Sequence, residues 1–158
     1  MQFPPLPPDA DETPEQAVGF HFEDVSFDLP HAGQLTEWLR SIARAESKPF
    51  IEVNYIFCSD EYLRKVNVEY LDHDYYTDII TFPYGEAGEI HGDLFISSER
   101  VADNAQTLGV SFQHELCRVM AHGVLHLAGY GDKSPEEEAL MRQKEDFYLQ
   151  QLDNAALS

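Results

Sequence analysis

Two histidines and an aspartate between positions 122 and 132 have the types and spacing of metal ligands. The segment reads His-Gly-Val-Leu-His-Leu-Ala-Gly-Tyr-Gly-Asp, beginning at His122 and ending at Asp132. Residues four apart in an α-helix differ by about 40° around its axis, so His122 and His126 project from one face, one turn apart. Two imidazoles at this spacing can share an ion, and Gly129 lets the chain leave the helix so that Asp132 becomes a third ligand. The segment therefore predicts a metal site made by His122, His126 and Asp132.

Three protein ligands indicate the chemistry that the metal would serve. They leave the fourth position of a tetrahedral zinc ion to water, which is the pattern of catalytic rather than structural zinc. Because a bound ion lowers the pKa of its water to about 7, the site favours a metal-dependent hydrolase. Glu115 lies two turns before His122 on the same face, where it can orient a ligand or a water or, alternatively, satisfy the amides of the first helical turn. We predict one zinc ion per chain, with His122 and Glu115 as the catalytic residues.

Gly123 narrows the class of hydrolase. It follows the first histidine, at the position where zinc proteases with a His-Glu-x-x-His motif carry their glutamate base. The absence of that base argues against peptide hydrolysis by the same mechanism and leaves a zinc hydrolase of another substrate open. Two histidines and one carboxylate can also hold iron in oxygenases, which is a further formal alternative.

The elements that must position these residues follow from hydrophobic periodicity and capping residues. Alternating apolar residues predict strands, Gly85–Glu89 reads as a hairpin loop between two of them, and three- to four-residue spacing predicts helices. The predicted strands are 18–27, 51–57, 78–84 and 90–96; the predicted helices begin at 34, 59, 97 or 98, 111 and 134. The order predicts an α+β (α/β-like) fold with a small mixed sheet of about four strands flanked by helices. Residues 1–16, rich in proline and acid, are expected to be a flexible tail, and residues 17–158 a single compact domain.

Composition limits where the protein works and what it binds. The chain of 158 residues has 29 acidic side chains and 10 Lys plus Arg, a net charge of −19, which argues against unaided binding to a polyanion. No apolar run approaches the roughly 20 residues that a bilayer span needs, so no membrane partner is expected. Cys58 and Cys117 lie in apolar segments and are expected to be buried free thiols. These features predict a cytoplasmic protein.

Three blocks of the sequence resemble the YbeY-type rRNA maturation factors. The stretch His122-Gly-x-Leu-His-Leu-x-Gly-Tyr130 is similar to the family signature. Asn67-x-x-Tyr70 followed by Thr77-Asp-Ile-Ile-Thr-Phe-Pro resembles a second block, and Gly92-Asp-Leu-x-Ile-Ser a third. The match covers about residues 35 to 150, in order and at the family's spacing. The resemblance implies a single-domain, zinc-associated endoribonuclease that matures ribosomal RNA in the cytoplasm, close to the ribosome.

The chain departs from that family at two positions. The usual third ligand of the family is histidine, whereas this chain has Asp132, and a carboxylate is also a competent zinc ligand. The residue after the family's tyrosine is usually an arginine implicated in RNA cleavage, whereas this chain has Leu71. An arginine there would bind the scissile phosphate through two hydrogen bonds, so its loss bears directly on catalysis.

The sequence thus predicts a zinc-dependent endoribonuclease that acts on single strands in ribosomal RNA maturation and ribosome quality control. Its expected partners are ribosomal RNA and ribosomal particles or small-subunit proteins, with no DNA. Leu71 and the charge of −19 favour an alternative from another class, a ribosome-associated assembly factor with a mainly structural metal and weak or absent nuclease activity.

Overall fold

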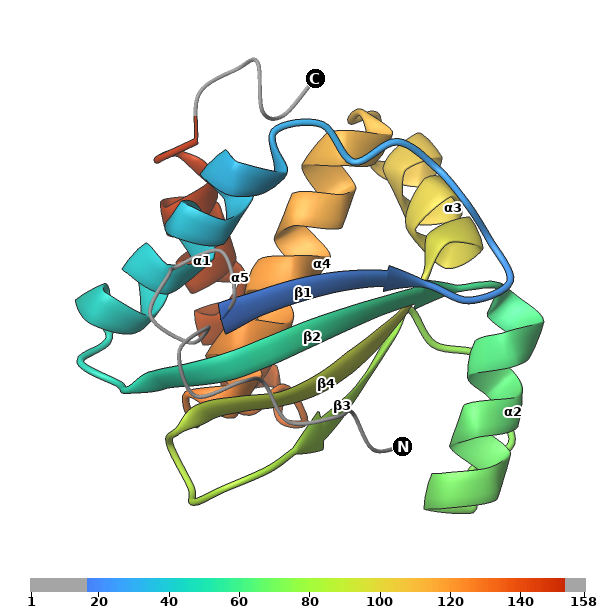
Figure 1. The fold of residues 1–158 in the computed structure, drawn as a ribbon, viewed down its shortest axis with the longest axis horizontal. Helices are drawn as coiled ribbons and strands as arrows, with labels where there is room; N and C mark the ends of the chain where they lie inside the picture. Colours follow the sequence, from blue (N-terminus) through green and yellow to red (C-terminus); the bar gives the residue numbers. More distant parts are fainter. Residues whose placement is uncertain (1–16, 153–158) are drawn as a thin grey trace, which may run out of the picture.

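The structure is a computed structural model that describes residues 17–152 (Figure 1). Every predicted helix and strand is present, with ends within a few residues of those expected except at the first strand. The strands are β1 (Val18–Phe22), β2 (Phe50–Cys58), β3 (Ile79–Pro83) and β4 (Ile90–Ser97). The helices are α1 (Ala32–Ala45), α2 (Asp60–Leu71), α3 (Ser98–Leu108), α4 (Phe112–Leu127) and α5 (Pro135–Leu149).

The four strands form one mixed sheet in the order β1-β2-β4-β3. β2 pairs in parallel with both β1 and β4, because α1 and α2 carry the chain away from the sheet after each of the first two strands. β3 pairs antiparallel with β4 and is joined to it by the predicted hairpin loop. The sheet confirms the predicted α+β fold with four strands.

Alternating side chains divide the core between the two faces of the sheet. Tyr55, Phe57, Leu94 and Ile96 pack with α1, α4 and α5 in the main core. Their neighbours Ile56, Cys58, Phe95 and Ile80 point the other way and pack against Leu63 and Val66 of α2. Figure 1 shows α1, α3, α4 and α5 gathered on one side of the sheet and α2 apart from them. Cys58 and Cys117 are buried free thiols, as expected.

The first strand is shorter than predicted, ending at Phe22 rather than Phe27. The chain leaves the sheet because Asp24 accepts hydrogen bonds from both the backbone amide (2.8 Å) and the hydroxyl (2.5 Å) of Ser59. Phe27 still packs on the core, edge-on to Phe57 and Phe112, so the alternation of aromatic residues reflected burial rather than strand pairing.

Residues 17–152 form one domain, while the predicted tail at 1–16 and the last six residues lie outside the described part of the chain. Between residues 17 and 152, the helices are all too short or too polar to cross a membrane.

Candidate functional site

Helix α4 carries both histidines and packs closely on the sheet. It begins at Ser111, whose hydroxyl accepts a hydrogen bond from the amide of His114 (3.0 Å), as an N-cap serine should. Gly123 faces the sheet, where an added Cβ would come within 2.9 Å of Leu94 and 3.2 Å of Ile79. A glutamate at position 123 would therefore enter the core rather than the site. The packing explains why this helix has glycine where zinc proteases have a base.

The turn after α4 brings Asp132 back to His122. Gly129 adopts a φ of 117°, which side chains rarely allow, and the amide of Tyr130 donates to the carbonyl of Leu125 (3.1 Å). The Tyr130 hydroxyl is anchored on Glu46 at the end of α1 (2.6 Å). As a result, Oδ2 of Asp132 lies 3.2 Å from Nε2 of His122. The prediction that Asp132 folds back toward the helix agrees with this distance.

His122, His126 and Asp132 line one cleft of about 410 Å³, which we call the histidine cleft. Its other walls are the C-terminal end of α2, the loop that follows α2, and β3. Leu71, the residue that departs from the family pattern, lines the same cleft and is partly exposed. The cleft thus brings together the three predicted ligands and Leu71, which stands where the family usually has an arginine.

His122 is oriented by a residue that the sequence did not single out. Its Nδ1 lies 2.7 Å from Oε2 of Glu145 on α5, whose side chain is only 2% exposed. With Nδ1–H donating to Glu145, loss of the Nε2 proton to a metal leaves the Nε2 lone pair directed toward Asp132, which is the tautomer that a metal-binding histidine needs. Burial alone would lower the pKa of His122, but Glu145, Asp78 and Asp132 together raise it above its ordinary value.

Arg118, one turn before His122, connects Glu145 to Glu115, which lies two turns before His122. The guanidinium of Arg118 donates to Glu145 (3.0 Å) and to both oxygens of Glu115, one of them at 2.8 Å. Burial alone would raise the pKa of Glu145, but the bonds and charges of His122 and Arg118 hold it below its ordinary value. Glu115 is fully buried and contacts Arg118 instead of His122. These contacts are those of a residue that fixes Arg118. The catalytic role of Glu115 stays a prediction.

The site carries an excess of negative charge. Asp78, Glu115, Asp132 and Glu145 supply four carboxylates, against two guanidinium groups (Arg118 and the exposed Arg142) and one imidazole among the residues they contact. Burial raises the pKa of Asp78, which faces the histidine cleft, and the charges of Arg118 and His122 only partly oppose this. Carboxylates that outnumber the neighbouring cations at a cleft favour a bound cation.

Glu145, but not Arg118, could have been found from a simple signal. Along α5, buried Met141, Tyr148 and Leu149 mark the apolar face, and Glu145 lies on that face four residues after Met141. An ion on the buried side of an amphipathic helix needs a partner, but the pattern cannot tell which residue it is. Arg118 gives no such signal, because it lies on the polar side of α4 with His122, one turn away.

A second groove, of about 520 Å³, lies between α2 and the outer face of β3 and β4. It is lined mainly by aromatic and aliphatic side chains and contains none of the predicted ligands. The titratable groups converge in the histidine cleft, so chemistry is assigned there.

Comparisons with known proteins agree with the resemblance seen in the sequence. A family model described as "Endoribonuclease YbeY" matches residues 21–153. A protein named Endoribonuclease YbeY from Cytophaga hutchinsonii is 51% identical over 136 residues, covering 85% of this chain and 95% of its own. One of the same name from Flavobacterium johnsoniae is 53% identical over 129 residues, covering 82% and 92%. The solution structure of TM1509 from Thermotoga maritima is similar with a TM-score of 0.62 and 28% identity, over 84% of this chain and 87% of that one.

Proposed function

Because the chain belongs to the YbeY endoribonuclease family, we propose that it is a metal-dependent endoribonuclease acting on single-stranded parts of ribosomal RNA. The observation that carries this proposal is His122, fixed through Nδ1 by buried Glu145 while Nε2 faces Asp132 in the histidine cleft. A histidine held on one nitrogen by a carboxylate, with the other directed into a cleft, is typical of a metal ligand. The proposed substrate follows from the family, and the proposed metal from the donors.

The donor set fits a zinc-class ion held by His122, His126 and Asp132. Two donors about 2.1 Å from one tetrahedral ion lie about 3.4 Å apart, close to the 3.2 Å between His122 Nε2 and Asp132 Oδ2. Within residues 17–152, no group of three or more His, Cys, Asp or Glu side chains is already arranged as a metal cage. His126 is exposed and the side chain of Asp132 is 40% exposed. We expect both to reorient at little cost on binding, whereas His122 is already fixed.

The chain's own residues would prepare the site for hydrolysis. The ion, when bound, would supply an acidified water and polarise a phosphate oxygen. Glu145 holds the ring of His122, and Arg118 holds Glu145 while placing a positive charge 4.0 Å from Asp78 at the cleft wall. Asp78, whose pKa is raised by burial, is placed where it could exchange a proton with a group in the cleft.

The net charge of −19 supports a ribosomal setting, with ribosomal particles or small-subunit proteins as partners in the cytoplasm. An acidic chain repels free RNA, so a partner that presents the strand would raise the rate of encounter. The same charge, with Leu71 in the cleft, favours a second candidate function: an assembly factor with a mainly structural metal and weak nuclease activity.

The third ligand can be tested by substitution. Asp132→Ala is expected to weaken zinc binding by more than the roughly 10–100-fold typical of losing an outer supporting partner, because a direct donor is removed. Asp132→His is expected to retain the ion. Affinity would be measured by titration against a competing chelator, with Glu138→Ala, an exposed acid on α5 near Asp132, as the matched control. Equal affinity of Asp132→Ala and wild type would mean that another group in the cleft is the ligand.

Leu71→Arg distinguishes the nuclease from the assembly factor. Because Leu71 lines the histidine cleft, an arginine there can add a charge-assisted contact to a phosphate and is expected to raise cleavage of free RNA. Neighbouring cations do not replace it: Arg64 is paired with Glu61 and Asp74, and Lys65 lines the other groove. Cleavage of one ribosomal RNA fragment would be compared at low and moderate salt, with Val68→Arg on exposed α2 surface as the control for added charge. No cleavage by either Leu71→Arg or wild type, with retained binding to ribosomal particles, would favour the assembly factor.

A further inference from the structure

Two aromatic side chains stand stacked and exposed on the wall of the histidine cleft. The rings of His73 and Tyr75 have centroids 5.3 Å apart and planes inclined by 21°. The Tyr75 hydroxyl lies 3.2 Å from Nδ1 of His73, which links the two side chains. Tyr75 is nevertheless 53% exposed, so a large part of its apolar surface faces solvent. Exposed aromatic surface at a cleft is typical of a binding site.

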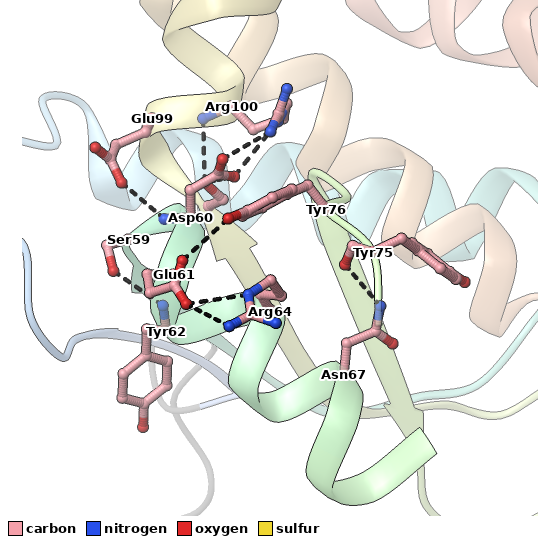
Figure 2. Close-up of polar contacts among 11 residues, drawn as sticks. Ser59, Asp60, Glu61, Tyr62, Arg64, Asn67, Tyr75, Tyr76, Glu99 and Arg100 are labelled. Carbon is pink, nitrogen blue, oxygen red and sulfur yellow. Dashed lines mark hydrogen bonds and ion pairs between the residues drawn. The ribbon is translucent and has the colours of Figure 1, made fainter. Parts of the chain in front are cut away.

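The loop that carries the pair is held firmly at both ends. The side-chain amide of Asn67, itself 1% exposed, donates to the carbonyl of Tyr75 (3.2 Å), and the carbonyl of Asn67 accepts from the amide of His73 (3.1 Å). Arg64 binds Asp74 (2.6 Å) from the adjacent turn of α2. Figure 2 shows the Tyr75 ring directed away from α2, with the carbonyl of Tyr75 turned toward Asn67. The backbone is thus fixed while the ring is free to contact a ligand.

Tyr76 secures the other side of the loop. Its hydroxyl donates to Glu61 (3.1 Å), and the guanidinium groups of Arg64 and Arg100 lie 6.0 and 5.6 Å from its ring centre. Arg100 is in turn bound to Asp60 at the start of α2 (2.7 Å), as Figure 2 shows. The side chain of Tyr76 therefore serves to attach the loop to α2 and α3, whereas the side chain of Tyr75 contacts His73 within the loop. This division leaves His73 and Tyr75 preorganised, so a ligand would not have to order the loop.

The charge around the pair indicates which part of a nucleotide it would meet. Asp72 and Asp74 flank His73; Asp74 is paired with Arg64, which leaves the carboxylate of Asp72 to disfavour a phosphate at this place. An aromatic face, by contrast, binds any nucleobase by stacking and requires no positive charge. The exposed cation of the cleft, Lys133, lies on another wall, in the loop after α4, whereas Arg118 in α4 is bound to Glu115 and Glu145. The cleft can therefore take phosphate on one side and a base on the other.

We propose that the stacked pair His73–Tyr75 is a subsite for one unpaired nucleobase of the RNA strand bound in the histidine cleft. This inference rests on the proposed function and makes it more specific. A base that stacks on Tyr75 must be unpaired, so the subsite selects single strands over duplexes. Stacking also lets a chain with a charge of −19 bind RNA with few phosphate contacts.

The test is fluorescence of a short single-stranded 2′-O-methyl RNA that contains one 2-aminopurine, a base whose emission falls when it stacks. Wild type is expected to quench it and to bind it roughly ten-fold more tightly than Tyr75→Leu, which retains apolar bulk but loses the ring face. Tyr75→Phe should quench like wild type. Tyr70→Leu is the matched control, since Tyr70 is a tyrosine of similar exposure that lines the other groove. The ratio of the two affinities should not change with salt, because no charge is altered.

Cleavage of unmodified RNA is measured on the same proteins, so that a failure of the nuclease proposal can be distinguished from a failure of the subsite proposal. Quenching that Tyr75→Leu loses and Tyr70→Leu keeps supports the subsite, even if wild type cleaves nothing and the nuclease proposal fails. Equal quenching by wild type and Tyr75→Leu overturns the subsite, even if wild type cleaves RNA. Equal losses in Tyr75→Leu and Tyr70→Leu overturn it as well, as does equal quenching of the oligonucleotide annealed to its complement.

Discussion

Replacing His122 and His126 together by alanine is expected to reduce the bound zinc-class ion from about one per chain to none and to abolish RNA cleavage. Both imidazoles line the histidine cleft, and Asp132 alone cannot hold an ion against water. Metal content would be measured by elemental analysis of protein purified from zinc-replete cells. Chelation of wild type should remove cleavage, and added zinc should restore it. The double variant should not respond to zinc.

A control of the same residue type separates loss of the site from loss of the fold. His91→Ala removes a half-buried histidine on β4 that contacts Tyr84 and lies outside the histidine cleft, so metal content should stay unchanged. Circular dichroism would establish that both variants are folded. A metal-free wild type, or a double variant that still carries one ion, would contradict the assignment of His122 and His126.

Arg118→Met is expected to cause the largest loss of stability among single substitutions in the site, about 3–5 kcal/mol. Methionine keeps much of the volume but leaves the carboxylates of Glu115 and Glu145 buried without their common cation. Their side chains are 0% and 2% exposed, so water cannot replace the guanidinium without a rearrangement. The free energy of unfolding would be measured by urea denaturation at neutral pH.

Arg142 provides the matched control. Its guanidinium lies 3.9 Å from the same Glu145, but its side chain is 52% exposed. Ion pairs with an exposed partner contribute little to the free energy of unfolding, so Arg142→Met is expected to change it by no more than about 0.5 kcal/mol. Adding Glu115→Gln to Arg118→Met should recover part of the loss, because one uncompensated charge is removed. Equal effects of Arg118→Met and Arg142→Met would show that the buried network does not support the site.

Much of the fold could be predicted because its signals are local. The 3.6-residue period of α4, the serine caps of α2, α3 and α4, and the Ser-Pro start of α5 each depend only on neighbours in sequence. The same dependence on local signals made the predicted first strand too long. Apolar alternation records burial, and Phe27 is partly buried without pairing in the sheet. The chain leaves the sheet where Asp24 binds Ser59, 35 residues away, and no local pattern in the sequence predicts that contact.

The proximity of His122 to His126 and Asp132 could be predicted from the sequence, because helical geometry and a glycine turn place residues that are close along the chain. The residues that support them are visible only in the folded chain. Glu145 reaches His122 from 23 residues away and Arg118 reaches Glu145 from 27, through the packing of α5 on α4. The tertiary structure also decided that Leu71, His73 and Tyr75 share the cleft of the histidines, since only the crossing of α2, β3 and α4 brings these segments together. Contacts between elements depend on how whole helices and strands pack, and no spacing along the chain encodes that directly.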